Sequence, residues 1–403
     1  MTSTRGERQP LSPRATLYWV VLICMFSQAG YGGSRVAVSL YALELGASQF
    51  AVGAIVALYA LCATTLSIVI GRYADRTPPR VPVIVGTVAM AVMLLLPAAF
   101  GNLYLLGFVA FVLGLAHQIF SIPLEALIGG IGGPQRRAAN YTAITLGWSI
   151  ANMVGPIITG YLIDSVGHAR VFPALAALVA MPLLILAWRP GLLPTVAAQQ
   201  GGKSEAGGRI ADLWRMKSLR NIILCAGIIG SAQDLFQFYM PVYGHSIGLS
   251  ASAIGTILGT MYGAAFCVRA IIPWMVTRIP ELKILTGAVF LAAVTYAAIP
   301  VFTHELVLAA LAFALGLGVG CATPMTLSLL YALSPPGRVA EAIGLQKTVR
   351  HGSYLVVPMI FGSVGAVFGN VAVFLFNAAL LGGSGMLMRK VRVTVKAPPS
   401  GGQ

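Results

Sequence analysis

Long apolar runs follow one another along the whole chain. One of them, VPVIVGTVAMAVMLLLPAAF at 81–100, contains no charged residue. A helix rises 1.5 Å per residue, so about 20 apolar residues are needed to cross the hydrocarbon core of a bilayer. The composition agrees, because 58% of the residues are hydrophobic and only 9% are charged, whereas soluble domains are roughly a quarter charged. The chain is therefore predicted to be an integral membrane protein made of helices.

Turns rich in glycine, proline and charge divide these runs into twelve predicted spans. We expect the spans at 17–43, 50–70, 81–100, 103–128, 139–163, 170–188, 221–244, 251–277, 284–302, 306–333, 341–365 and 369–388. Basic residues precede the first span, as in a signal peptide. Its apolar run is far longer than the roughly 7–15 residues of a signal peptide, so we expect it to remain a helix. The predicted fold class is all-α, with twelve transmembrane helices.

The basic residues lie almost entirely on one side of the predicted membrane. With a cytoplasmic N-terminus, the 26 Lys and Arg residues all face the cytoplasm except Arg170, which is external, and Arg35, Arg269, Lys347 and Arg350, which lie within spans. Membrane proteins keep basic loops on the cytoplasmic side. The pattern predicts a multi-pass protein of the cytoplasmic (inner) membrane of a prokaryote, with both termini cytoplasmic. It also accounts for the formal net charge of +15 without a nucleic-acid partner.

The second half of the chain repeats the first at a constant shift of 202 residues. Glycines, prolines and loop arginines dominate the matches, which are Tyr41 with Tyr243, Gly46 with Gly248, Ser48 with Ser250, Gly53 with Gly255, Arg76 with Arg278, Pro78 with Pro280, Gly114 with Gly316, Arg136 with Arg338, Pro156 with Pro358, Gly160 with Gly362, Gly167 with Gly369 and Phe172 with Phe374. Six spans return the chain to the same side, so the repeats are parallel and related by an axis along the membrane normal. Such repeats are typical of alternating-access transporters.

The repeat and the polar interruption between its copies define the predicted regions. These are an N-terminal six-helix bundle at 1–189, a cytoplasmic linker at 190–218, a C-terminal six-helix bundle at 219–390 and a disordered tail at 391–403. The linker contains QQGGKSEAGG, a flexible composition. It ends in IADLWRMKSLR, which favours either a short helix on the membrane surface or a cytoplasmic extension of the seventh span.

A charged loop, GRYADRTPPR at 71–80, joins the second and third spans. Its Gly71, Asp75, Arg76 and Arg80 resemble the loop signature G-x-x-x-D-R/K-x-G-R-R/K of the major facilitator superfamily, whose members also have twelve spans in a 6+6 arrangement. The resemblance implies a cytoplasmic gate, in which Asp75 faces the N-terminus of the eleventh span and is stabilised by roughly 0.3–1 kcal/mol. Glu125 is placed to pair with Arg76 or Arg80. The alternative is that these charges only mark a cytoplasmic loop.

The fifth span contains a second pattern of this family. Its sequence LGWSIANMVGPIITGYLID places Gly147, Gly155, Pro156 and Gly160 where proton-driven exporters of the superfamily have the pattern G…GP-x-x-G-G. Thr159 stands where a glycine is usual. The resemblance implies a helix-bend motif and an exporter that exchanges its substrate for protons.

Asp234 lies midway along the seventh span, in GSAQDLFQFYMP. An ionisable residue at this depth is costly and is therefore expected to have a partner or a function. A carboxyl group in a low dielectric can load and release a proton near neutral pH. We predict that Asp234 couples transport to protons. The alternative is a fixed ion pair with Arg35, Arg269 or Arg350.

Polar residues of the first, fourth, fifth, seventh, eighth and eleventh spans are predicted to line a central substrate cavity. They are Gln28, Tyr31, Arg35, His117, Gln118, Trp148, Asn152, Gln233, Gln237, Arg269, Arg350, His351 and Tyr354. Two of them have a simpler alternative, since Arg35 could snorkel to the outer headgroups and His117 could be a structural hydrogen-bonding group. The basic residues within the spans favour an anionic or zwitterionic substrate.

The sequence has no nucleotide-binding loop and no spacing of catalytic side chains. We therefore predict that the protein is not an enzyme, has no cofactor other than the proton as coupling ion, and is a monomer that binds a small organic molecule within the lipid bilayer. The predicted function is proton-coupled secondary transport by alternating access, in the direction of export. The alternative is proton-coupled uptake of an organic anion.

Overall fold

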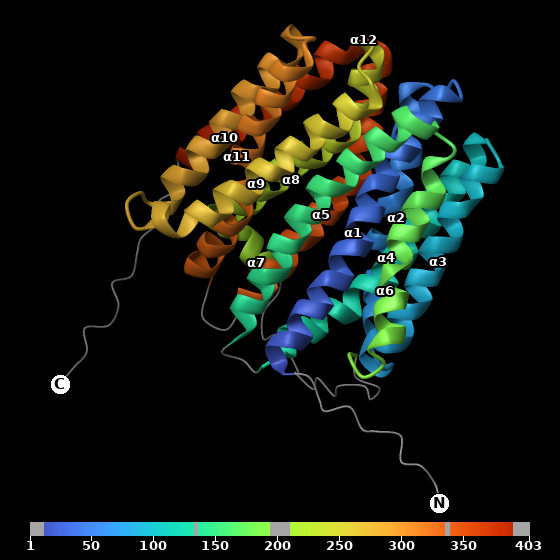
Figure 1. Cartoon of the computed structure of the whole chain (residues 1–403). Coiled ribbons are helices and arrows are strands. Elements are labelled where there is room, and N and C mark those ends of the chain that lie inside the picture. Colours follow the sequence, from blue (N-terminus) through green and yellow to red (C-terminus); the bar gives the residue numbers. More distant parts are fainter. Residues whose placement is uncertain (1–11, 133–135, 194–209, 335–338, 390–403) are drawn as a thin grey trace, which may run out of the picture.

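The computed structural model describes residues 12–132, 136–193, 210–334 and 339–389 (Figure 1). The first half of the chain forms six long helices: α1 Pro13–Glu44, α2 Gln49–Arg76, α3 Arg80–Ala99, α4 Leu103–Gly130, α5 Arg137–Val166 and α6 Val171–Trp188. The described part of the chain begins and ends on the same side of the bundle in Figure 1. We call this side the terminal end, and the opposite side, where α1 turns into α2, the distal end.

The second half forms the helices α7 Ile210–Arg215, α8 Lys217–Ser246, α9 Ala251–Val276, α10 Glu281–Ala298, α11 Glu305–Leu333 and α12 Val339–Arg389, with a 3₁₀ turn, η2 Ile299–Val301, after α10. Met216 has extended backbone and separates α7 from α8. Gly369 interrupts α12 with non-helical angles, so 339–368 and 370–389 are two successive spans. The predicted all-α fold of twelve spans is confirmed.

The two halves repeat each other in local detail. Gly46 and its repeat mate Gly248 have φ values of 80° and 78°, and Gly167 and its mate Gly369 have 89° and 79°. Residues with a side chain rarely adopt such angles, so these glycines end the helices at the same places in both halves. The next helices also begin alike, because Ser48 and Ser250 each accept a hydrogen bond from the backbone N–H three residues on.

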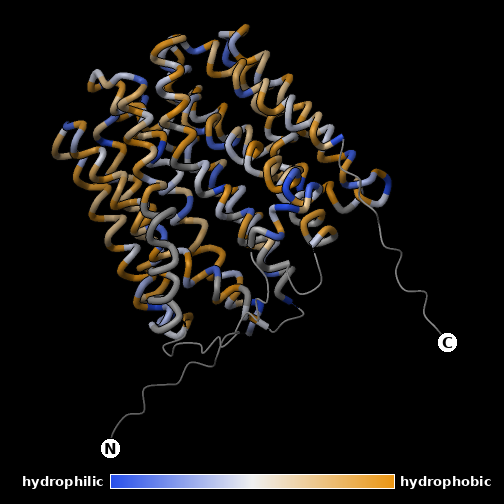
Figure 2. Tube along the Cα trace, turned by 180° about the vertical axis from the view of Figure 1, so that it is seen from behind, coloured by the Kyte–Doolittle hydropathy of each residue, from blue (hydrophilic) through white to orange (hydrophobic). Residues whose placement is uncertain are grey.

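The helices expose apolar side chains to the surroundings, as a lipid-facing surface requires. On α3, Val81, Val85, Val88, Val92 and Leu95 are exposed at the alternating spacing of one helix face. Ten helices of the described residues are long and apolar enough to cross a membrane, and Gln49–Leu61 is a shorter apolar segment. Figure 2 shows hydrophobic residues along most helices and hydrophilic residues mainly at turns and within the middle of the bundle.

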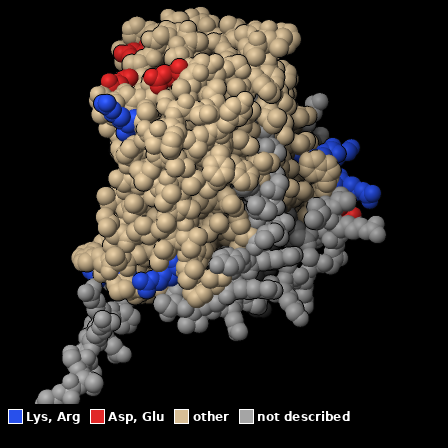
Figure 3. Space-filling view, turned by 90° about the vertical axis from the view of Figure 1, so that its right-hand side faces the viewer, with Lys and Arg blue, Asp and Glu red and all other residues tan. Residues whose placement is uncertain are grey.

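Charged side chains gather at the two ends of the bundle. In Figure 3, acidic side chains cluster near the distal end, whereas most basic side chains lie nearer the terminal end. The broad middle of this face has almost no charge. A neutral band between charged ends is expected of a protein that lies in a bilayer.

The halves meet along three pairs of helices. The helix α5 packs on α9, α2 packs on α12, and α1 approaches α8. Because α1 and α8 occupy equivalent places in the two halves, as do α5 and the first part of α12, the interface has the same pseudo-two-fold symmetry as the sequence repeat. The space between the halves is therefore lined by equivalent helices from both sides.

Candidate functional site: a central polar cavity and its distal closure

A neutral polar network covers the inner face of the first half. The Gln28 amide donates to Asn152 Oδ1 at 3.1 Å, and its Oε1 lies 3.1 Å from His117 Nε2. The His117 ring stacks on Tyr31, with centroids 4.0 Å apart. These four predicted cavity residues come from α1, α4 and α5 and are half-buried. The structure thus brings them together as one wall.

Arg35 reaches across the boundary between the halves. Its Nη1 donates to Gln237 Oε1 at 2.7 Å. The two residues are repeat mates, 202 residues apart, so this bond lies close to the pseudo-two-fold axis. The Arg35 guanidinium binds within the protein instead of extending alone toward the distal surface.

The second half contributes a more basic wall. Residues of α8, α11 and α12 line a recess that contains Gln233, Thr323, Thr326, Gln346 and Arg350. Arg269, on α9, donates to the Ser149 hydroxyl of α5 and so also bridges the halves. Arg269 and Arg350 thus bring two guanidinium groups from the second half toward the boundary between the halves.

Asp234 lies within the packing of the second half. Only 3% of the residue is exposed, and its charge acts on the Tyr296 hydroxyl of α10. That hydroxyl donates to the carbonyl oxygen of Ala232. The Tyr296 side chain of α10 thus reaches α8 close to Asp234, whereas Gln233 lines the recess. The role of Asp234 in proton coupling remains a prediction.

The fifth-span motif fits α5 closely between α1 and α9. A Cβ at Gly155 would overlap the carbonyl oxygen of Ala29, and one at Gly160 would overlap that of Ala251. Thr159, at the unusual position, is fully buried and donates to the Gly155 carbonyl at 2.8 Å. Its hydroxyl occupies the place where a Cβ of Gly33 would be. A glycine on α1 thus makes room for the threonine on α5.

The small residues of the motif continue across the boundary. A Cβ at Gly255 on α9 would overlap the carbonyl oxygen of Pro156, and one at Gly259 would overlap the Ile157 side chain. Small residues let two helix backbones approach closely where no hydrophobic force favours their association. The motif therefore fixes how closely the two halves approach along α5 and α9.

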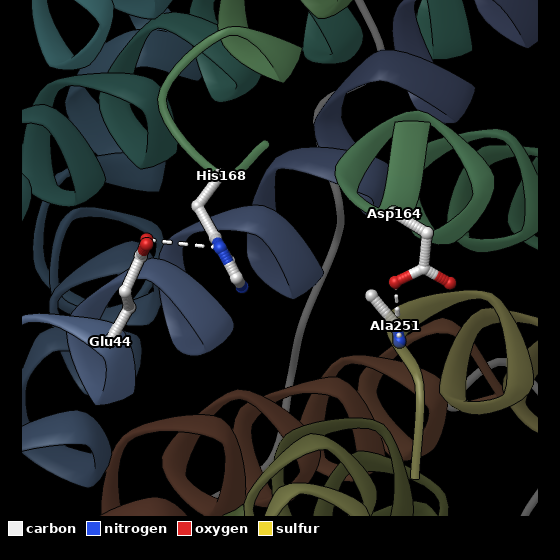
Figure 4. A network of polar contacts seen from close by, with 4 residues as sticks. All are labelled: Glu44, Asp164, His168 and Ala251. Atoms are coloured by element: carbon white, nitrogen blue, oxygen red, sulfur yellow. Dashed lines mark hydrogen bonds and ion pairs between the residues drawn. The ribbon is translucent and has the colours of Figure 1, made fainter. Parts of the chain in front are cut away.

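Asp164 joins the halves at the distal end of the same seam. Its Oδ1 accepts from the Ala251 N–H at 3.0 Å and its Oδ2 from the Ser252 N–H at 2.7 Å. Figure 4 shows the carboxylate aimed at the first turn of α9. A carboxylate at this position pairs with free N–H groups and with the positive end of the helix dipole. Sequence reasoning missed this residue, because an acid beside a turn resembles an ordinary surface charge.

The second seam, between α2 and α12, closes with neutral side chains. Gln49 donates to Asn370 Oδ1 at 3.0 Å, and the Tyr239 hydroxyl donates to the same oxygen at 2.7 Å. Asn370 in turn donates to Ser246 Oγ at 2.7 Å. These residues were also missed, since single amides near turns carry no distinctive sequence signal.

The distal turns of the two halves use equivalent positions with different chemistry. Glu44 and His168 approach to 3.0 Å in the first half (Figure 4). Their repeat mates are Ser246 and Asn370, which are joined by the neutral hydrogen bond described above. The equivalent turns thus make a polar contact in both halves, an acid with a histidine in one and two neutral side chains in the other.

The predicted gate at the terminal end is described only in part. The described side chains do not include those of Asp75, Arg76, His351 and Tyr354. Gly71 lies in the same part of α2 as Asp75 and Arg76. Arg80 donates to the carbonyl oxygen of Pro190 at 3.0 Å, which ties α3 to the start of the linker. Glu125 is half-buried, and its charge acts on Cys24 of α1.

The remaining predicted residues lie on the first half. Gln118 accepts a hydrogen bond of 3.4 Å from the Ser121 hydroxyl. Trp148 is half-buried and packs against the hydrophobic core. A Cβ at Gly147 would lie 2.9 Å from Val21 Cγ1, so α5 also approaches α1 closely at this level.

Two parallel six-helix repeats with a lipid-facing apolar surface and polar walls between them define a membrane transporter. The sequence profile of the Major Facilitator Superfamily matches residues 20–354. The chain belongs to this superfamily, and its fold and family are those of membrane transporters.

The chain is similar to proteins described as multidrug resistance proteins. One, described as "Multidrug resistance protein MdtG" from Dickeya zeae, is 22% identical over 401 residues, which covers 93% of this chain and 94% of the relative. Another, "Multidrug resistance protein 1" from Bacillus subtilis, is 28% identical over 228 residues, with 55% and 57% of the two chains covered.

Solved transporter structures have the same fold. A POT family transporter in complex with 5-aminolevulinic acid superimposes with a TM-score of 0.78 at 14% identity, covering 94% of this chain and 96% of the other. The nucleoside transporter NupG gives a TM-score of 0.75 at 14% identity, with 94% and 100% covered.

Proposed function

We propose that this protein exports small organic molecules across the cytoplasmic membrane in exchange for protons. In this proposal both termini are cytoplasmic, as the distribution of basic residues predicts, so the terminal end of the bundle faces the cytoplasm and the distal end faces outward. The observation that carries the proposal is the packing of α5 between α1 and α9, through Gly155 and Gly160. This is the helix whose sequence resembles the exporters of the superfamily, and the relatives described as multidrug resistance proteins agree with that direction.

The proposed transport cycle uses the two ends of the bundle in turn. In the described conformation, the distal end is held together by Asp164 of α5, which binds the first turn of α9, and by Gln49 with Asn370. The central polar walls would then receive substrate from the cytoplasm. Release to the outside requires the distal contacts to break while the gate around Asp75 closes the cytoplasmic end. Rocking of two rigid halves about a central site is the motion that parallel repeats permit.

Asp234 is the proposed site of proton coupling. Its carboxyl group is buried in the second half, where the ionised form is costly. Loss or gain of a proton there would change the packing of α8, the helix that also contains Gln233 and Gln237. A change at Asp234 could in this way alter which end of the bundle is open.

The test is proton movement in inverted membrane vesicles, followed with a pH-sensitive dye. Wild-type protein is expected to move protons when an exported compound is added, and Asp234→Asn is expected to abolish the signal. Asp212→Asn is the matched control, because Asp212 is exposed on α7 outside the spans. Proton movement that persists in Asp234→Asn would remove Asp234 from the coupling role.

The second candidate function is proton-coupled uptake of an organic anion. It is favoured by Arg269, which bonds to Ser149 across the boundary between the halves, and by Arg350, which lines the recess of the second half. Right-side-out vesicles separate the two candidates. Export predicts accumulation only in inverted vesicles with an imposed proton gradient, whereas uptake predicts accumulation in right-side-out vesicles under the opposite gradient.

A further inference from the structure

We propose that an anionic phospholipid of the surrounding membrane binds at the terminal end of the first half, with its phosphate group on the guanidinium of Arg189. This residue directly follows α6, a helix that packs on both α1 and α3. The ligand is a lipid with a negatively charged headgroup, of the phosphatidylglycerol type. The surface lies outside the central cavity, so the site is the same for either direction of transport.

Arg189 lies at the level of the lipid headgroups. The apolar span of α6 covers Val171–Trp188, and Arg189 is the next residue. The Trp188 side chain is 59% exposed, and Tyr18 near the start of α1 is 72% exposed. Exposed tryptophan and tyrosine side chains are typical of the boundary between hydrocarbon and headgroups. A guanidinium group at this level therefore lies beside lipid phosphate groups.

The Arg189 guanidinium rests on two indole rings. Its Cζ atom lies 4.6 Å from the centre of the Trp188 ring and 5.9 Å from that of the Trp19 ring on α1. The two rings meet edge to face, with centroids 5.6 Å apart. We call Trp19, Trp188 and Arg189 the tryptophan clamp. Stacking on rings leaves the N–H donors in the plane of a guanidinium available, and their fork matches the oxygens of a phosphate.

The protein supplies no anion to this guanidinium within the described residues. There Arg189 forms no ion pair, and its Nε is buried without a hydrogen-bond partner. The acids of the first half whose side chains are described are Glu44 and Asp164, at the distal end, and Glu125, whose charge acts on Cys24. A half-buried charge beside hydrocarbon is costly unless it is paired. A lipid phosphate can supply the missing partner through paired hydrogen bonds.

A second basic residue holds the backbone beside the clamp. Arg80, the first residue of α3, donates from Nη1 to the carbonyl oxygen of Pro190 at 3.0 Å. Its bond fixes the segment that follows Arg189, and its positive charge lies at the same end of the bundle. In the orientation of the proposed function, this end faces the cytoplasmic leaflet. Anionic lipids of that leaflet are attracted by basic side chains close to the membrane.

The second half contains a simpler arrangement that serves as a comparison. The Arg278 guanidinium lies 4.4 Å from the centre of the Trp274 ring. The Trp274 side chain is 55% exposed, much like Trp188, but Arg278 itself is exposed. Water can therefore hydrate its donors, and no lipid is needed to compensate its charge. Arg278 is thus a matched control for Arg189, with the same pair of residue types and a different degree of burial.

The test measures which lipid lies next to the clamp in a bilayer. The full-length protein, with Trp148, Trp214 and Trp274 replaced by phenylalanine, is reconstituted into phosphatidylcholine vesicles. Its remaining fluorescence comes from Trp19 and Trp188, and lipids brominated in the upper part of an acyl chain quench it on contact. We expect phosphatidylglycerol to bind here at least about fivefold more tightly than phosphatidylcholine, as one basic group near a membrane surface allows. Equal quenching by the two lipids would overturn the proposal.

Variants connect the lipid preference to Arg189. Arg189→Gln is expected to bring the ratio of the two affinities close to one. Arg189→Lys should keep only part of the preference, because an ammonium group lacks the planar fork. Arg278→Gln should keep the wild-type ratio, and size exclusion shows that each variant is folded. A preference that persists in Arg189→Gln, or that is lost in Arg278→Gln, would mean that the basic surface attracts lipid as a whole, and the site would be rejected.

Inorganic phosphate distinguishes a lipid from a soluble anion. Added in large excess, it should leave the preference for phosphatidylglycerol as it is in sodium chloride of the same ionic strength, because only a lipid also places acyl chains against Trp188. Loss of the preference in phosphate alone would show that the clamp takes a phosphate group from solution, and it would overturn the lipid assignment.

Discussion

Asp164 illustrates how one side chain can decide the state of the whole protein. It contributes two hydrogen bonds to the N-terminus of a helix in the other half. Its Oδ atoms have no equivalent in the second seam, since the repeat mate of Asp164 is Ala366. The α5–α9 seam therefore has a charged closure and the α2–α12 seam a neutral one.

We expect Asp164→Ala to favour an open distal end. The two lost hydrogen bonds have a charged acceptor, and each such bond contributes roughly 1.5–3 kcal/mol, so the open fraction should rise at least about tenfold. Asp164→Asn should have an intermediate effect, because it keeps one acceptor. The measurement uses intact cells that express a variant without native cysteines but with Gln233→Cys. The quantity measured is the rate at which a membrane-impermeant maleimide labels this new cysteine. Ser165→Ala is the control, since that hydroxyl bonds only within its own helix turn; equal rates in Asp164→Ala and this control would contradict the assignment.

Thr159 and Gly33 form a second pair whose residues depend on each other. Gly33→Ala should destabilise the folded protein by about 1–3 kcal/mol, because the new methyl group overlaps the Thr159 hydroxyl. Thr159→Gly should recover part of this loss, with a coupling of roughly 0.5–3 kcal/mol in a double-mutant cycle of thermal stability in detergent. Recovery is partial because Leu175 and Gly155 also approach the site. Gly287→Ala is the control, since nothing lies near its Cβ position; strictly additive effects would show that the two residues are independent.

At the scale of helices, the contact between α5 and α9 is set by backbone atoms. At Gly255 the obstacle to a side chain is the Pro156 carbonyl, which cannot move aside, whereas at Gly263 it is the flexible end of Met153, at 3.1 Å. The two glycines lie on one face of α9, eight residues apart, and differ mainly in what they touch. They therefore provide a matched pair of substitutions.

Gly255→Ala is expected to push α9 away from α5 and to reduce substrate-driven proton movement in vesicles to a small fraction of the wild-type signal. Gly263→Ala is expected to keep most of it, because the Met153 side chain can change rotamer at little cost. Both variants should reach the membrane at normal levels, which is checked by fluorescence-detected size exclusion. Equal activity in the two variants would show that close approach at Gly255 is not required for transport.

The fold was predictable from the sequence to a greater degree than the closure of the cavity. Apolar runs and a constant repeat predict twelve spans, because these depend on length and spacing alone. Gln28, Tyr31 and Arg35 were assignable to one face by helical periodicity. The partners of Asp164 were not, because they are the backbone N–H groups of Ala251 and Ser252, and every helix has such groups. Only the arrangement of helices in space identifies which helix faces the carboxylate.

At the scale of the whole molecule, alternating access requires the distal contacts between the halves to break in every cycle. Contacts within one half need not change. The chain offers one pair of each kind at the same level, since Gln49 and Asn370 join the halves, whereas Glu44 and His168 join two turns of the first half. A cross-link is therefore expected to have opposite consequences at these two places.

We expect a cross-link between Gln49→Cys and Asn370→Cys to stop transport, in a protein whose five native cysteines have been replaced. The two side chains meet at their ends, so we choose a short reducible bis-thiosulfonate reagent, which bridges a wider gap than a direct disulfide. Substrate-driven proton movement should fall to background on cross-linking and return after reduction.

The same reagent on Glu44→Cys with His168→Cys should leave transport close to normal, because that pair moves as one body. Transport that continues in the cross-linked Gln49–Asn370 variant would show that the distal end need not open between these helices, and the rocking of two rigid halves would have to be replaced by a more local opening.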